Sequence, residues 1–119
     1  MTITLPQVYD ISPGDIELIA IDYTNALASA ETLTNPSVVQ AEAEEDSSES
    51  SSLVSLAFAN IKINITEIPI LGRLVAVGKA VQFKVSGQSL NVSYRIRITV
   101  KTTSSPIRTL VRDITFNCV

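Results

Sequence analysis

Alternation of apolar and polar residues with a period of two constrains this chain more than any other feature, because successive side chains of a β-strand point to opposite faces. The pattern is clearest in residues 92–101, where every second side chain is apolar. These apolar side chains are Val92, Tyr94, Ile96, Ile98 and Val100. A strand of this kind buries one face and leaves the other in water, so we expect a half-buried antiparallel strand here.

Six further segments have strand character, and turn-forming residues separate them. They are residues 16–23, 37–41, 61–66, 73–77, 81–85 and 109–119. Glu67 and Ile68 break the alternation, which predicts a bulge or strand end near Thr66. One helical turn is expected at residues 25–29, with Thr24 as its cap. About seven short strands without an amphipathic helix of useful length predict an all-β antiparallel sandwich.

The length of 119 residues suits one domain with a single core. Residues 1–15 are predicted to form an extended N-terminal arm, which pairs either with a neighbour or with the edge of the sheet. Residues 16–119 are predicted to form the sandwich. Residues 42–52 are acidic and serine-rich, a composition that cannot pack a core, so we expect a solvated loop there.

Composition excludes several classes of function. A net charge of −3 argues against nucleic-acid binding, which depends largely on clustered Lys and Arg. Membrane insertion is not expected, because no apolar run reaches the roughly 18 residues that a spanning helix needs. The lone Cys118 cannot form an internal disulfide, which suits a protein assembled in a reducing cytosol.

An enzyme is not expected, because the chain contains no histidine. That removes the commonest general base and the commonest metal ligand, together with any Ser-His-Asp or Cys-His arrangement. The acidic tract lacks the alternating ligands and central glycine of a calcium loop. We therefore predict no catalytic residue, no metal site and no cofactor.

Charged residues are the candidates for partner binding. Arg95, Arg97 and Lys101 share one face of the strand at residues 92–101, and the acidic tract supplies Glu44, Glu45 and Asp46. Two interpretations stay open. The basic face and the acidic tract could dock like subunits by charge complementarity, or the basic residues could simply form an ordinary polar outer face.

Three parts of the chain resemble a known family. The first is residues 12–33, with the run Asp-Tyr-Thr-Asn-Ala-Leu-Ala-Ser-Ala-Glu-Thr that starts at Asp22; the second is residues 80–87; the third combines residues 94–100, 102–104 and 112–116. Together they are similar to the fibre-tail adaptors of tailed bacteriophages, which are small immunoglobulin-like virion domains. Residues 34–55 depart from the family pattern, because the acidic tract resembles an insertion. The turn at residues 88–91 is also poorer in glycine than the family pattern.

The resemblance implies an immunoglobulin-like β-sandwich without catalytic residues. It also implies a structural virion protein, made in the cytoplasm of the bacterial host, that joins the tail or neck to the tail fibres in several symmetry-related copies. Its partners would then be other virion proteins. A decoration or cement protein on the capsid is an alternative with the same fold. A carbohydrate-binding or receptor-binding module is a further alternative, which the small number of aromatic rings disfavours.

Overall fold

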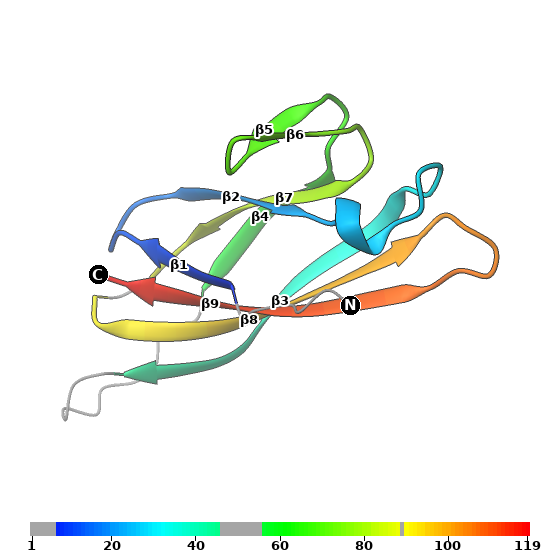
Figure 1. Cartoon of the computed structure of the whole chain (residues 1–119). Coiled ribbons are helices and arrows are strands. Elements are labelled where there is room, and N and C mark those ends of the chain that lie inside the picture. The colour runs from blue at the N-terminus through cyan, green and yellow to red at the C-terminus, as the bar shows by residue number, and fades with distance from the viewer. Residues whose placement is uncertain (1–6, 46–55, 89) are drawn as a thin grey trace.

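The computed structural model describes residues 7–45, 56–88 and 90–119, and it is almost entirely β-structure (Figure 1). The strands of the described residues are β1 (Gln7–Ile11), β2 (Glu17–Asp22), β3 (Leu33–Glu45), β4 (Ala57–Ile63), β5 (Ile68–Ile70), β6 (Arg73–Val75), β7 (Ala80–Ser86), β8 (Val92–Thr102) and β9 (Thr109–Cys118). Thr24–Ala26 forms a short 3-10 turn, η1. The predicted all-β sandwich is confirmed.

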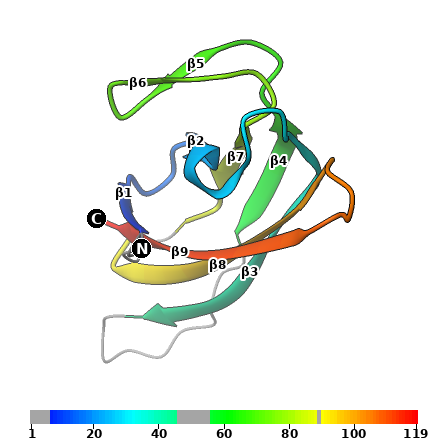
Figure 2. The ribbon, with the colours of Figure 1, turned by 45° about the vertical axis from the view of Figure 1, so that its right-hand side comes forward.

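Two sheets pack face to face. One has the strand order β1-β9-β8-β3 and the other the order β2-β7-β4. Strands β1 and β9 run parallel, whereas the other neighbouring strands are antiparallel. Strands β5 and β6 form a separate hairpin, which lies on the side of the three-stranded sheet away from the four-stranded one (Figure 2).

The core lies between the two larger sheets, and β8 provides its longest stripe. All the apolar side chains of the alternation predicted for residues 92–101 are buried, and the polar ones face outward. The ring of Phe83 on β7 lies 6.5 Å from that of Phe116 on β9, which joins the two layers. Fully burying a side chain of this size contributes about 1.5–3 kcal/mol.

Part of the predicted N-terminal arm belongs to the sandwich. Gln7–Ile11 is β1, which pairs with β9 at one edge of the four-stranded sheet and buries Ile11 in the core. Of the two pairings that the sequence left open, the structure contains the one with the sheet's edge. The sandwich therefore begins before residue 16, and residues 1–6 lie outside the described part of the chain.

The predicted acidic loop at residues 42–52 starts too early. Strand β3 continues to Glu45, with Glu42 opposite Arg95 and Ala43 opposite Tyr94 on β8. The long neighbouring strand supplies main-chain partners to this point, so the acidic residues remain in the ladder in spite of their low strand propensity. Residues 46–55 lie outside the described part of the chain.

Strand β4 ends three residues before the end predicted at Thr66. Asn64 turns the chain there, and Ile65, which the alternation placed in the core, is exposed.

The helical turn is also shorter than predicted. Thr24 does not act as its cap, because Asp22 Oδ1 accepts hydrogen bonds from both the backbone N–H and the hydroxyl of Thr24, at 2.8 and 2.6 Å.

Candidate docking surfaces

The predicted basic residues lie on the outer face of the four-stranded sheet, where cross-strand acids pair with two of them. Arg95 Nη2 lies 3.1 Å from Glu42 Oε1 on β3. Arg97 donates two hydrogen bonds to Asp113 on β9, from Nε at 2.9 Å and from Nη2 at 3.2 Å. These hydrogen bonds hold the pKa of Asp113 below its usual value and raise the pKa of Arg97.

The outer face is therefore close to electrically neutral instead of basic. Lys101 is exposed and stands in register between Thr34 and Thr109. Glu44 and Glu45 continue the β3 ladder opposite Ser93 and Val92, but the structure describes only their backbone. Asp46 lies outside the described residues. Among the described side chains, the structure thus places Glu42 and Asp113 on the same sheet face as Arg95 and Arg97.

A second group of polar residues fastens the loop between β2 and β3. Glu31 is buried and accepts hydrogen bonds from the Ser104 hydroxyl, from Arg108 Nη2 at 2.5 Å and from the Ala28 N–H at 3.1 Å. These donors lower the pKa of Glu31 to about 2. The group ties the η1 loop to the β8–β9 turn, and the sequence alone gave no signal for it, because its members lie far apart in the chain.

A third polar group anchors the β5–β6 hairpin. Asn64 is only 1% exposed, and its side chain makes four hydrogen bonds. Its Nδ2 donates to the carbonyls of Thr66 and Ala76 at 3.0 and 2.9 Å. Its Oδ1 accepts from the backbone N–H groups of Lys79 and Ala80 at 3.1 and 3.0 Å. One amide thereby fixes both ends of the hairpin to β7.

The hairpin presents an apolar surface to solvent. We call residues 65–77 the apolar hairpin. Val75 is buried and Ile68 and Ile70 are partly buried, so these three form its inner side. The exposed side chains run from the tip to the base: Leu71 (91% exposed), Leu74 (68%), Val77 (50%) and Ile65 (79%). Four of the large exposed apolar side chains of the described residues therefore lie on this one hairpin.

The tip of the apolar hairpin is a two-residue turn formed by Leu71 and Gly72. Both residues have positive φ, 52° and 78°. This turn type favours Asn-Gly or Asp-Gly, because a bulky side chain is disfavoured in the left-handed region. Leucine costs roughly 1–2 kcal/mol in this conformation. The turn therefore holds a largely exposed leucine in a strained backbone conformation.

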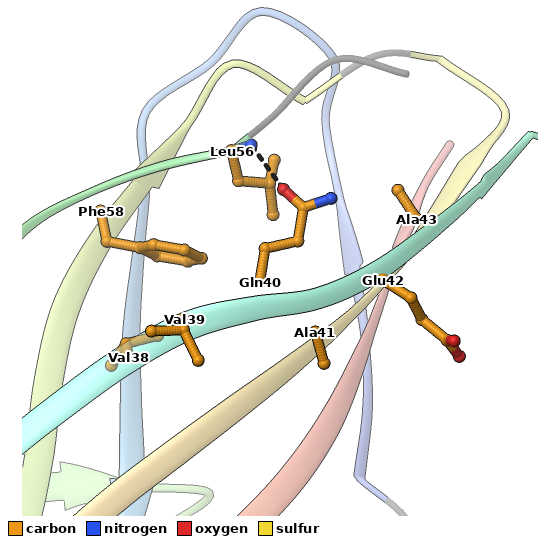
Figure 3. Close-up of a pocket in the computed structure, with 8 residues that line it drawn as sticks. All are labelled: Val38, Val39, Gln40, Ala41, Glu42, Ala43, Leu56 and Phe58. Atoms are coloured by element: carbon orange, nitrogen blue, oxygen red, sulfur yellow. Dashed lines mark hydrogen bonds between the residues drawn. The ribbon is translucent and has the colours of Figure 1, made fainter. Parts of the chain in front are cut away.

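A cavity that is largely open to solvent lies between the free edges of the two sheets, at β3 and the start of β4 (Figure 3). We call it the β3–β4 cavity. Its volume is about 530 Å³. Gln40 reaches across from β3, and its Oε1 accepts a hydrogen bond from the Leu56 N–H at 2.7 Å, as the dashed line shows. The lining residues are Val38, Val39, Gln40, Ala41, Glu42, Ala43, Leu56 and Phe58.

The described residues contain no cluster of His, Cys, Asp or Glu that could hold a metal ion. Among them there is also no helix long and apolar enough to cross a bilayer. Cys118 is buried and carries a free thiol, whose pKa is raised mainly by burial.

Comparison with family models, with curated proteins and with solved structures finds no match to this chain.

Proposed function

We propose that this protein is a non-enzymatic docking module, and specifically a fibre-tail adaptor in the virion of a tailed bacteriophage. The observation that carries the docking role is the apolar hairpin, with Leu71 91% exposed on a strained turn. A side chain held in this way has no role in the core of its own domain. It is suited to a pocket on another protein.

The assignment to the adaptor family rests on the resemblance of three sequence stretches. These stretches coincide with the framework of the fold: residues 12–33 contain β2, residues 80–87 contain β7, and the remainder lies in β8 and β9. The resemblance therefore covers strands that build the core. Residues 34–55 depart from the family pattern, and the described part of this stretch, residues 34–45, contains most of β3 and lines one wall of the β3–β4 cavity.

We infer that the sandwich is immunoglobulin-like. In the constant-type form of that fold, the first, second, fifth and fourth strands form one sheet, and the third, sixth and seventh form the other. The orders β2-β7-β4 and β9-β8-β3 agree with this pattern for the second to seventh strands, once the β5–β6 hairpin is set aside as an insertion before β7. The first strand departs from the pattern, because β1 pairs in parallel with β9 in the other sheet.

Aromatic residues give little support to the alternative of a carbohydrate-binding module. The three Tyr and three Phe of the chain all lie in the described residues, and each is buried or partly buried. Carbohydrate sites usually rest on accessible aromatic rings beside polar groups. Docking through apolar side chains and strand edges fits the observed surfaces better.

The proposed function is tested by counting and locating the protein in whole phage particles. Native mass spectrometry of the particles gives its copy number, and imaging of labelled virions gives its position. The adaptor function predicts a fixed, small number of copies at the tail or neck. Hundreds of copies over the capsid would replace it with decoration, and absence from particles would remove the virion role.

A further inference from the structure

We propose that the free edge of strand β2 pairs with the same edge of a second copy of this chain, so that the two three-stranded sheets join into one. The inference rests on the docking function proposed above and deepens it, because it names a partner and a contact surface. Among the described residues, β2 is one edge strand of the order β2-β7-β4.

Strand β2 lacks the features that protect the other edges of the two larger sheets. Its register with β7 runs from Glu17 to Asp22 without a shift. Strands β3 and β4, the edges on the opposite side of the sandwich, each have register shifts. Strand β1 is regular, but it presents the exposed charge of Asp10. A regular edge without a bulge, a proline or a lysine is a template for a further strand.

The main-chain groups of β2 that point to the free edge follow from one hydrogen bond. The Tyr23 N–H donates to the Lys79 carbonyl at 2.9 Å, and these two residues are opposite each other, one position beyond the paired residues of β2 and β7. Hydrogen-bonded and non-bonded pairs alternate along an antiparallel ladder. Leu18 and Ala20 therefore turn their N–H and C=O groups away from β7, where a further strand could bond to them.

Arg112 closes one end of this edge. Its Nη1 donates to the Asp22 carbonyl at 3.1 Å, which shows that this carbonyl also points away from β7, as the alternation requires. The Asp22 carbonyl thus has a partner within the chain. The open part of the edge lies toward the start of β2, so pairing with another strand is expected to centre on Leu18.

The side chains along the open part of the edge are apolar and self-complementary. Ile16, directly before the strand, and Leu18 are 72% and 67% exposed, and Ala20 continues their alternation on the outer face. Opposed residues of an antiparallel pair point to the same face. A second copy centred on Leu18 therefore places this leucine beside its own counterpart and Ile16 opposite Ala20. Glu17 lies opposite Ile19 in this register, so like charges do not oppose each other.

The apolar hairpin extends over the same edge. In Figure 2 it lies above β2 and reaches past it, on the side away from β7 and β4. A strand that pairs with β2 therefore lies on the side of the hairpin tip, where Leu71 is 91% exposed. The second copy thereby offers this side chain an apolar neighbour.

Two identical strands that pair antiparallel are related by a two-fold axis, so the contact uses the same patch on both copies and closes at two. Both hairpins then lie on the same side of the joined sheet. One pair of short strands joins a small area, and interfaces below roughly 1,200 Å² are typical of transient complexes. Dimerisation of the purified protein should therefore depend strongly on concentration.

Sedimentation velocity of the full chain over roughly 1 µM to 1 mM tests the contact at the two-fold axis. Leu18→Lys and Leu18→Glu each bring two like charges together at the centre of the dimer. Each variant alone should dimerise at least about tenfold more weakly than the wild type. An equimolar mixture of the two variants brings opposite charges together there, so it should recover a one-to-one dimer. This rescue requires that Leu18 of one copy meets Leu18 of the other.

The matched controls are Ile107→Lys and Ile107→Glu, because Ile107 is 66% exposed and lies in the turn between β8 and β9. Both should dimerise as the wild type does. Equal losses in these controls would overturn the inference, as would a mixture of the two Leu18 variants that stays monomeric while the wild type dimerises. A wild type that stays monomeric up to 1 mM would also overturn it and leave the β2 edge to a strand of another protein.

These outcomes are separable from the test of the proposed function. A protein that is monomeric in solution but present at the tail in a fixed number retains the adaptor function and loses the β2 contact. A protein that dimerises as described but is absent from particles retains the contact and loses the virion role.

Discussion

The outer face of the four-stranded sheet and the apolar hairpin are both exposed, but they differ in whether their side chains have interaction partners within the same chain. On the sheet face, Arg95 and Arg97 find acids on the neighbouring strands of the same sheet. On the hairpin, Leu71 and Ile65 remain largely accessible to water. Paired charges have little to gain from a partner, whereas exposed apolar groups gain by leaving water. The hairpin is therefore the better candidate for docking.

The hairpin can be exposed and still well positioned because polar groups hold its base. At this base, Asn64 makes its four hydrogen bonds to the two ends of the hairpin and to the backbone at the start of β7. The Gly78 carbonyl accepts a hydrogen bond from the Leu33 N–H at 2.8 Å. The apolar tip is thus presented on a base that is fixed to β7 and β3. Changes at the base should reduce stability, and changes on the charged face should not.

The largest effect is expected for Asn64→Ala. The substitution removes four hydrogen bonds, and the two that Asn64 accepts from the N–H groups of Lys79 and Ala80 are buried. The Lys79 N–H keeps the Ala76 carbonyl at 3.3 Å, whereas a buried group left unsatisfied costs about 1–3 kcal/mol. Partial compensation by water makes a total loss of about 3 kcal/mol the expected result. Urea denaturation at neutral pH measures it. Asn25→Ala, at an exposed position, is the control and should change stability by less than about 0.5 kcal/mol. Equal losses in both variants would show that Asn64 is not an anchor.

Gly78→Ala should have the next largest effect. Gly78 has φ of +82°, and an added Cβ would lie 2.8 Å from Thr32 Cγ2. Gly14, with φ of +80° and open space around it, is the matched control. Positive φ alone costs about 1 kcal/mol for alanine, and the clash should bring Gly78→Ala to about 2–3 kcal/mol. Equal midpoints in urea for the two variants would mean that Thr32 moves aside freely.

Much of the framework could be predicted from the sequence. The alternation in residues 92–101 and 81–85 gave β8 and β7 with the correct inward residues, because a half-buried strand carries its own pattern. Turn residues such as Gly72 and Gly78 were also found, and both have positive φ. Local chemistry determines these features, so local reasoning recovers them.

The rest depends on contacts between distant residues. Ile65 continues the alternation of β4, yet it is exposed because Asn64 prefers hydrogen bonds to the hairpin and β7. Strand β5 was not among the predicted strands: it is only three residues long and contains Pro69, which a strand at the edge of a sheet tolerates. The pairing of Arg97 with Asp113 needs the β8–β9 register, which the sequence does not state. The sequence therefore predicted a basic face, because the acids that pair with Arg95 and Arg97 lie on the neighbouring strands β3 and β9.

A smaller change in stability is expected when the pH is lowered, because Glu31 then becomes protonated. The pKa of Glu31 is about 2 in the folded protein and lies below the ordinary value of 4.5. Its contribution to stability is therefore complete above about pH 4.5, and it is lost as the pH falls toward 2. Glu31→Gln should be less stable than the wild type at pH 7, and the difference should narrow between pH 4.5 and pH 2. The midpoints of urea denaturation at pH 7, 4 and 3 measure this difference in stability. Glu67→Gln, at an exposed residue, is the control. A difference that stays constant with pH would show that Glu31 is not held as an anion by Ser104 and Arg108.

The smallest effect should come from the charged face, and it bears most directly on the two interpretations that the sequence left open. If the outer face is an ordinary polar surface, the double variant Arg95→Ala and Arg97→Ala should associate in sedimentation velocity as the wild type does, because its charges are already paired within the copy. Leu71→Asp, which places a charge at the exposed hairpin tip, should weaken association measurably. The reverse result, with the double variant monomeric and Leu71→Asp unchanged, would move the docking surface from the hairpin to the sheet. It would also restore charge complementarity between subunits as the basis of assembly.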